Sequence, residues 1–468
     1  MAARFRFLYA FLFLFLISCA ENRIVREHSG FVPQPEKLSP SEQNVLAQYF
    51  AREKATQLDQ LLERYNRYYG FHGNVLIASK GNILYESGIG YAELREKTPL
   101  TTDAVFQLAS ISKQFTALAV CMLLEERKLD YNDQLTKFYP QLPYQNVTIR
   151  HLLNHTSGLP NYMWLVENSW KQERAPYNDE VINLMATTPM GVYFRPGRRF
   201  DYSNTGYMLL AAIVEKVSGV SFHDYVEERI FKPLDMESSF VYSSAREYNY
   251  GCRLGGFTRY RWGFRSVQED IHNGTVGDKG IYSTIEDLYK WDQALYSEKI
   301  VSSATLQKAF TPGTLNNRRN IPYGFGFRLS ERDDKKVVYH NGLWHGFRTS
   351  FMRYVEDSAT IIVLSHSNCE GKNNLVRQIE TVLFQQEQFN PAKVLAEVAL
   401  YQGVQQAVEH YHKMAGAGEL ANLQPFQLSE IAEILEQMNK PILSSRLQQL
   451  KQELHQLASM QSSPDAQG

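Results

Sequence analysis

Cysteine and net charge are both scarce in this 468-residue sequence. Its 4 cysteines are scattered, which excludes a disulfide framework and a Cys-x-x-Cys metal site. The 49 lysine and arginine residues balance 50 acidic residues, and the resulting net charge of −1 argues against a basic surface for nucleic acid. Hydrophobic residues make up 44% of the chain and charged residues 21%, which is typical of a protein that folds around a core.

The first apolar run is too short to span a membrane. It covers residues 7–17, fewer than the ~20 helical residues that a bilayer requires. Arginines precede it and Leu-Ile-Ser-Cys at 16–19 ends it, a pattern that resembles the lipobox of bacterial lipoproteins. The resemblance implies a lipoprotein signal peptide over 1–19, lipidation of Cys19 and attachment to the bacterial cell envelope, either at the outer membrane facing the periplasm or at the cell surface. The alternative is an ordinary cleaved signal peptide with a chance cysteine.

The next stretch predicts a tether followed by a main domain. Residues 20–42 contain prolines and polar residues without an apolar period, as a tether does. A helical pattern follows, and then two β-rich runs, 75–78 and 83–85, are joined by turn-forming residues and predict a hairpin. A long helical section comes next, and β-rich sequence returns in three short runs, 336–340, 349–354 and 360–364. We therefore expect one domain over 43–387, an α/β fold of the α+β type whose antiparallel sheet is split in the sequence by inserted helices.

The composition changes near Asn390 and Pro391, where strand-like runs end. Residues 388–468 predict a small all-α region. Leucines recur there at intervals of four and three, as in a coiled coil: Leu443, Leu447, Leu450, Leu454 and Leu457. Two interpretations stay open, a dimer contact or a helical hairpin that folds back on itself or on the main domain.

An S-x-x-K pattern lies where a turn gives way to an apolar helical pattern, at Ser110 and Lys113. If a helix starts there, the two side chains lie one turn apart on the same face and within reach of each other. A serine hydroxyl becomes a nucleophile when a neighbouring base takes its proton, and lysine can be that base when burial and nearby cations lower its pKa. On its own the pattern is common, because a helix cap followed by a solvated lysine has the same sequence.

Two further patterns follow the first one in a fixed order. A Y-x-N is present at Tyr202 and Asn204, and an H-x-G is present at His340 and Gly342 on a predicted strand. Flanking segments match as well, at 152–159 and 280–284. Together they make residues 55–385 resemble the serine hydrolases that include class C β-lactamases, D-Ala-D-Ala carboxypeptidases and related esterases. The resemblance implies a β-lactamase/transpeptidase-like fold, with an antiparallel sheet flanked by helices and a mostly helical insertion.

The resemblance also implies a role for each matching position. Ser110 would be acylated, while Lys113 and Tyr202 would share the proton transfers, and which of them takes the first proton stays open. The ammonium of Lys113 would lower the pKa of the Tyr202 phenol. Backbone N–H groups of Ser110 and Leu343 would form the oxyanion hole. The substrate-binding group would comprise Asn204, His340, Gly342 and Leu343.

The third motif departs from the β-lactamases, which usually carry K-T-G where this chain has His340, Asn341 and Gly342. An imidazole is only partly charged near neutrality, whereas the lysine that it replaces is permanently charged. Arg348 is a candidate for the missing cation. Gly342 suits its place because the absent Cβ lets substrate lie against the strand edge. We therefore expect carboxypeptidase or esterase activity rather than efficient β-lactamase activity.

No pattern in the sequence calls for a cofactor or a metal. His151 and His155 are four residues apart, as in zinc helices, but no glutamate base occupies the second position. We expect a serine hydrolase that cleaves an amide or ester through an acyl-serine intermediate and takes a small-molecule or peptide substrate. The alternative is a non-catalytic envelope protein that binds peptides, or a scaffold that contacts a partner through its C-terminal helices.

Overall fold

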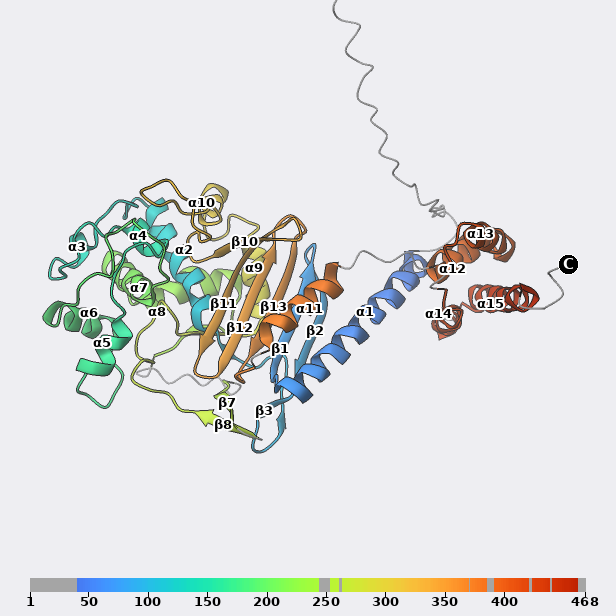
Figure 1. Ribbon diagram of the computed structural model, residues 1–468, viewed down its shortest axis with the longest axis horizontal. Coiled ribbons are helices and arrows are strands. Elements are labelled where there is room, and N and C mark those ends of the chain that lie inside the picture. The colour runs from blue at the N-terminus through green and yellow to red at the C-terminus, as the bar shows by residue number, and fades with distance from the viewer. Residues whose placement is uncertain are drawn as a thin grey trace, which may run out of the picture. The chain divides into compact units, whose positions relative to one another are not determined.

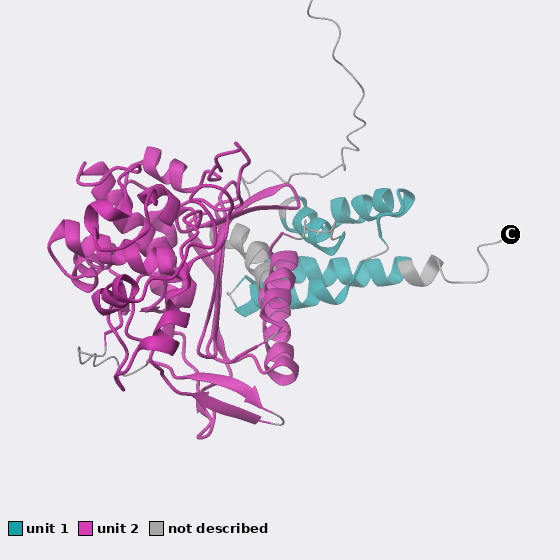
Figure 2. Ribbon diagram, turned by 60° about the vertical axis from the view of Figure 1, so that its left-hand side comes forward, with its two compact units in different colours: residues 1–52, 386–468 teal, residues 53–385 magenta. Residues whose placement is uncertain are grey.

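The computed structural model describes residues 40–243, 253–260, 263–369, 371–384, 391–420, 423–437 and 440–461. The chain divides into two compact units, one of residues 53–385 and one of residues 1–52 and 386–468 (Figure 2). The predicted signal peptide with Cys19, most of the predicted tether and the predicted boundary at 388 lie outside the described residues.

The unit 53–385 alternates strands and helices. Its helices are α1 (Pro40–Tyr69), which begins in the other unit, α2 (Ser112–Glu125), α3 (Leu135–Phe138), α4 (Ile149–Leu153), α5 (Tyr162–Ser169), α6 (Asn178–Thr187), α7 (Asn204–Ser218), α8 (Phe222–Val226), α9 (Ile285–Ala294), α10 (Ser303–Ala309) and α11 (Lys372–Phe384). Short helical turns are η2 (Ala109–Ile111), η3 (Glu227–Phe231) and η4 (Lys232–Leu234). The strands are β1 (Gly73–Ser79), β2 (Asn82–Ile89), β3 (Tyr91–Glu93), β4 (Thr98–Pro99), β5 (Phe106–Gln107), β6 (Phe240–Val241), β7 (Gly256–Tyr260), β8 (Gly263–Val267), β9 (Ile281–Ser283), β10 (Arg328–Arg332), β11 (Lys335–Trp344), β12 (Phe347–Tyr354) and β13 (Ala359–Ser365).

The central sheet has six antiparallel strands in the order β10-β11-β12-β13-β1-β2. Gly73 of β1 is paired with Ser365 of β13, so the two halves of the sheet come from opposite ends of the unit. A smaller sheet, β5-β9-β6, runs beside the start of η2. The predicted split sheet with inserted helices is confirmed.

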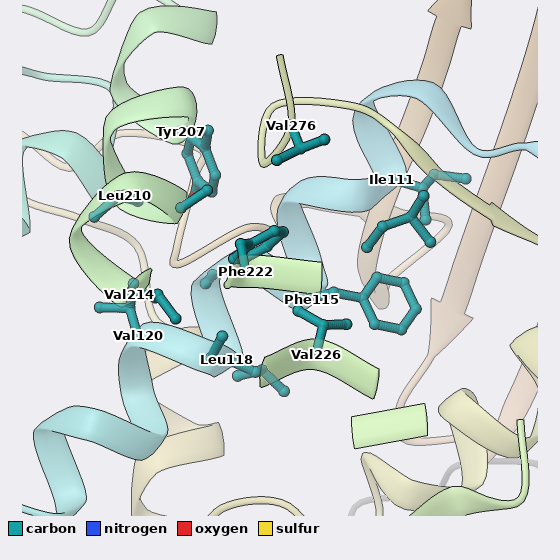
Figure 3. Packing of buried hydrophobic residues seen from close by; sticks show 14 of the residues in the cluster. Ile111, Phe115, Leu118, Val120, Tyr207, Leu210, Val214, Phe222, Val226 and Val276 are labelled. Carbon is teal, nitrogen blue, oxygen red and sulfur yellow. The ribbon is translucent and has the colours of Figure 1, made fainter. Parts of the chain in front are cut away.

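Strand alternation gives the sheet two apolar faces, as period-2 side-chain placement requires. On one face, Val75 and Ile77 of β1 pack with Leu62 of α1 and Ile379 of α11 (Figure 1). On the other face, Leu76 of β1 belongs to the larger core that surrounds α2. Figure 3 shows the centre of this core, where Phe115, Leu118 and Val120 meet Tyr207, Leu210, Val214, Phe222 and Val226. The helix α2, which carries Lys113 of the S-x-x-K pattern, is thus buried from Ser112 to Leu123.

Strand β10 was not predicted, and β11 is longer than the predicted run 336–340. β11 passes through Gly342, which was expected on a strand, and reaches Trp344 because residues 341–344 continue to pair with β12. β10 has the sequence Arg-Leu-Ser-Glu-Arg, whose charged residues hide the strand pattern but suit the edge of a sheet.

The helices of residues 391–461 have an apolar core of their own. They are α12 (Pro391–Gln402), α13 (Val404–Gly416), α14 (Phe426–Gln437) and α15 (Pro441–Gln461). Leu447, Leu450 and Leu454 of α15 are buried in this core with Leu428 and Ile431 of α14. The leucine seam is therefore used within the chain, as in the hairpin interpretation, and the packing of α14 against α15 forms that hairpin.

A buried ion pair joins the sheet to α9. The Nε atom of Arg353 on β12 donates to Oδ1 of Asp292 at 2.6 Å, and both side chains are almost fully buried. We expect Asp292→Ala to lower the free energy of unfolding by about 3–5 kcal/mol, because it leaves a guanidinium buried without its partner. Urea unfolding would measure this loss. The double variant Asp292→Leu with Arg353→Met should lose less than the single one, and the opposite order would contradict the prediction.

Candidate active site

Ser110 lies at the junction of the small sheet and α2. It is the middle residue of the 3₁₀ turn η2, which leads directly into α2. Ala109 before it has a φ of +52°, a left-handed conformation that alanine rarely adopts. The turn packs against Gly342, where an added Cβ would collide with Leu108 O and with the side chain of Thr349. Gly342 is therefore required for close packing of β11 on the serine turn, a different reason from the substrate access predicted for it.

Lys113 stands one turn after Ser110, as the spacing predicts. Its Nζ atom lies 3.2 Å from Ser110 Oγ and donates to the main-chain oxygen of Asp278 at 2.6 Å. The lysine is completely buried, and this burial lowers its pKa to about 7, with Arg328 adding to the effect and Asp278 opposing it. A large fraction of Lys113 is thus neutral near pH 7 and able to accept a proton.

Tyr202 comes from the loop before α7, far from Ser110 in the sequence. Lys113 Nζ lies 4.9 Å from the centroid of the Tyr202 ring. Burial raises the pKa of the phenol well above its ordinary value, although the Ser110 side chain and Arg328 oppose the change. The Tyr202 hydroxyl is buried without a hydrogen-bond partner among the described residues, while the Ser110 side chain is near enough to influence its pKa. The expectation that Lys113 lowers this pKa was wrong, because desolvation outweighs the nearby charges.

A cavity of about 300 Å³ lies next to Ser110 and Tyr202. It is lined by Ser110, Tyr202, Arg328, Tyr339, Asn341, Gly342 and Leu343. Leu343 is 60% exposed and lines the cavity together with Ser110, and an oxyanion hole formed by their N–H groups stays a prediction. Arg328 is the cation in the lining, and it forms no ion pair within the described part of the chain.

His340 does not line this cavity. Its side chain is fully buried behind it, with the ring centroid 6.0 Å from that of Tyr202. Nε2 lies 3.1 Å from the Tyr323 hydroxyl and Nδ1 lies 2.8 Å from the main-chain oxygen of Asn341, so Nδ1 bears the proton and Nε2 accepts from the phenol. Burial, aided by Lys113 and Arg328, holds the pKa of His340 well below its usual range. His340 is therefore a neutral group.

Asn204 lies in a second cavity of about 240 Å³ that shares Tyr202 with the first. Its Oδ1 atom is buried and has no hydrogen-bond partner among the described residues. The structure thus brings Ser110, Tyr202, Gly342 and Leu343 to one cavity and places Asn204 beside it. Lys113 does not line the cavity but contacts Ser110 from the buried side.

Sequence reasoning missed Arg328, Asp278 and His155. Arg328 follows an alternation of aromatic residues and glycines at 323–327, a weak strand signal that could have drawn attention to it. Asp278 acts at Lys113 through its main-chain oxygen, which no residue pattern reveals. His155 was considered as a metal ligand and as part of the matching segment 152–159 but was given no role at the site, whereas its ring centroid lies 4.3 Å from that of Tyr202.

The described residues contain neither a metal-binding cluster nor a helix suited to span a membrane. In that part of the chain, no cluster of three or more His, Cys, Asp or Glu residues is arranged to hold a metal ion. None of the described helices combines the length and the apolar character that crossing a membrane demands.

Comparison with known proteins defines the class of this site. Residues 58–382 match the family model "Beta-lactamase", which covers most of the chain, and the chain therefore belongs to this family. With Ser110 and Tyr202 at one cavity and Lys113 in contact with Ser110, the protein is a β-lactamase-related serine hydrolase.

Individual relatives come from several groups of this family. The chain is 38% identical over 356 residues to penicillin-binding protein 4* of Bacillus subtilis (strain 168), covering 71% of this chain and 77% of that one. It is 26% identical to a D-aminopeptidase of Brucella anthropi, over 65% of this chain and 57% of that one. Among solved structures, it is similar to the octameric penicillin-binding protein homologue from Pyrococcus abyssi, with a TM-score of 0.62, 26% identity and coverage of 71% and 77%. The β-lactamase/transpeptidase-like fold is confirmed.

Proposed function

We propose that this protein hydrolyses amide or ester bonds in small substrates that carry a carboxylate, with D-amino-acid peptides of the cell envelope as the leading class. The observation that carries the proposal is the buried Lys113, whose Nζ atom lies 3.2 Å from Ser110 Oγ and whose pKa is lowered to about 7. A neutral amine at hydrogen-bond distance can take the serine proton.

In the acylation step, Lys113 is the base. Tyr202 is the weaker candidate because its raised pKa keeps the phenol protonated near neutrality. As Ser110 Oγ bonds to the substrate carbonyl carbon, its proton passes to Lys113. The carbonyl oxygen becomes an oxyanion that accepts from the N–H groups of Ser110 and Leu343.

The leaving group then departs with a proton. Tyr202 donates its phenolic proton to the leaving nitrogen or oxygen, the carbon–heteroatom bond breaks, and Tyr202 recovers a proton from the Lys113 ammonium. In deacylation a water molecule loses a proton to the same pair and attacks the ester carbon, and Ser110 regains its proton as the acid product leaves. Lys113 and Tyr202 end each cycle in their starting states.

Substrate recognition rests on Arg328 and on the free edge of β11. β11 pairs with β10 only as far as Tyr339, so residues 340–344 have no strand partner on that side within the described part of the chain. An extended peptide can align there through main-chain hydrogen bonds. Arg328, whose guanidinium lies 4.9 Å from the Tyr202 ring centroid, would bind the carboxylate of that peptide.

We expect p-nitrophenyl esters and D-Ala-D-Ala peptides to be hydrolysed faster than nitrocefin, because the neutral His340 replaces the lysine of β-lactamases. Initial rates at matched concentrations, with Ser110→Ala as the blank, give this ranking. Arg328→Met should lower kcat/KM for the peptide roughly tenfold more than for p-nitrophenyl acetate, because that ester has no carboxylate and reports only the effect of the lost charge on Lys113 and Tyr202. Nitrocefin as the best substrate, or an equal loss for both substrates in the variant, would contradict the proposal.

The envelope location is also a proposal, supported by the short apolar run at 7–17 and the lipobox-like sequence that ends at Cys19. In a bacterial host, the wild type should be recovered with membranes and should incorporate labelled palmitate. Cys19→Ser should lose the label and enter the soluble fraction. Equal palmitate labelling of both proteins would contradict lipidation at Cys19.

A further inference from the structure

His155 holds the chain on both sides of Tyr202. Its main-chain oxygen accepts from the N–H of Asp201 at 2.9 Å, and its Nδ1 atom accepts from the N–H of Ser203 at 3.0 Å. Tyr202 is the residue between these two bonds, and its ring lies against the imidazole with centroids 4.3 Å apart. One residue thus fixes the backbone before and after the phenol as well as one face of its ring.

The side chain of His155 has no hydrogen bond other than that with Ser203 among the described residues. The side chain is fully buried, with the rings of Tyr207 and Tyr323 at centroid distances of 4.9 and 4.4 Å. Because Nδ1 accepts a hydrogen bond, the neutral imidazole carries its proton on Nε2. That Nε2 atom is buried and has no hydrogen-bond partner among the described residues.

The backbone of His155 is itself held in an unusual conformation. Its φ is +57°, in the left-handed region that a non-glycine residue enters at a cost. This conformation follows directly after α4 and turns the main-chain oxygen and the ring toward the loop 201–203. A histidine that merely filled the core would need neither the turn nor the two hydrogen bonds.

We propose that His155 is a positioning residue for the reaction, which sets the place of the Tyr202 hydroxyl over Ser110 and Lys113 by gripping the segment 201–203. We call this arrangement the His155 clamp. It acts through Tyr202 and does not touch substrate. The inference rests on the function proposed above, because the position of Tyr202 matters only if its phenol transfers protons.

A double-mutant cycle separates positioning from general stability. His155→Leu keeps the volume but removes the acceptor, and we expect kcat to fall about 10–100-fold with KM changed less than about threefold, as for a displaced catalytic group. In the Tyr202→Phe background the same change should cost less than about threefold, because the hydroxyl that it positions is gone. His155→Asn should restore kcat to within about fivefold of the wild type, since asparagine tolerates the left-handed region and its Oδ1 can accept from Ser203.

His151, in the middle of α4, provides a control with a similar hydrogen bond. Its Nδ1 accepts from the backbone N–H of Thr148 at 3.2 Å, a bond of the same kind that does not involve the Tyr202 loop. His151→Leu should leave kcat within about threefold. The clamp would be overturned if His155→Leu lowered kcat by the same factor in the Tyr202→Phe background as in the wild type. It would also be overturned if His151→Leu lowered kcat as much as His155→Leu does.

An NMR measurement that does not depend on catalytic turnover tests the His155 clamp separately from the proposed function. In ¹⁵N-histidine NMR spectra of the full chain, the signal that disappears in His155→Asn should report the Nε2–H tautomer at neutral pH. A proton on Nδ1 would overturn the clamp whatever the activity. If the wild type has no Ser110-dependent turnover, the proposed function fails, and the tautomer alone decides whether His155 accepts from Ser203.

Discussion

The variant Ser110→Ala is expected to lose covalent labelling by a fluorophosphonate probe and to turn over esters at about 10⁻⁴ to 10⁻⁶ of the wild-type rate. Loss of a nucleophilic serine removes the covalent route, so only the effects of binding and of the oxyanion hole remain. Gel fluorescence after probe treatment and initial rates with p-nitrophenyl acetate measure the two effects.

Ser112 is the natural control for this experiment. It lies two residues further along, is fully buried, and its Oγ atom accepts from the N–H of Ile281 at 3.1 Å. Ser112→Ala should lower the stability by about 1 kcal/mol, the usual value of such a hydrogen bond, and remain labelled. Labelling that survives in Ser110→Ala and disappears in Ser112→Ala would place the nucleophile elsewhere.

Lys113→Met should reduce kcat/KM by about 10²–10⁴, the range for removal of a general base. The wild type should also show a pH profile set by this lysine. Because Lys113 must be neutral to accept a proton and its pKa is about 7, kcat/KM should rise as the pH increases through 7 and level off above it. In Lys113→Met the residual rate should lack that rise.

A second buried lysine allows the assignment to be checked. Burial, with help from Arg348, lowers the pKa of Lys372 to about 7 as well, but its Nζ atom contacts Asn341 Oδ1 at 3.1 Å and not Ser110. Lys372→Met should keep the rise near pH 7. If the rise disappears in Lys372→Met and persists in Lys113→Met, the proton acceptor has been assigned to the wrong lysine.

Much of the fold could be predicted because its strands repeat an apolar pattern. β1, β12 and β13 are buried and rich in β-branched or aromatic residues, so the sequence reveals them. β10 was not predicted, because an edge strand needs few apolar residues. The leucines of α15 indicated a buried seam, but their spacing alone could not decide between a second chain and the helices α12–α14 of the same chain.

The site was predictable where chemistry depends on short spacing. Local helical geometry alone places Ser110 and Lys113 one turn apart, and the 3.2 Å contact between Lys113 Nζ and Ser110 Oγ follows from this spacing. The pKa of Tyr202 could not be inferred in the same way, since its direction depends on how much water the folded chain excludes. Arg328 and His155 reach the site through tertiary packing, and a lone arginine or histidine carries no pattern.

The pairing of Gly73 with Ser365 has a consequence for how the protein folds during its synthesis. During synthesis the hairpin β1–β2 leaves the ribosome long before β13, its neighbour in the sheet, has been translated. Until then the edge of β1 that pairs with β13 is uncovered, and contacts so distant in the chain form slowly. The nascent polypeptide must therefore be kept from aggregating until nearly the whole hydrolase unit has emerged. The turn η2, which carries Ser110, packs against Gly342 of β11 only in the last stage of folding.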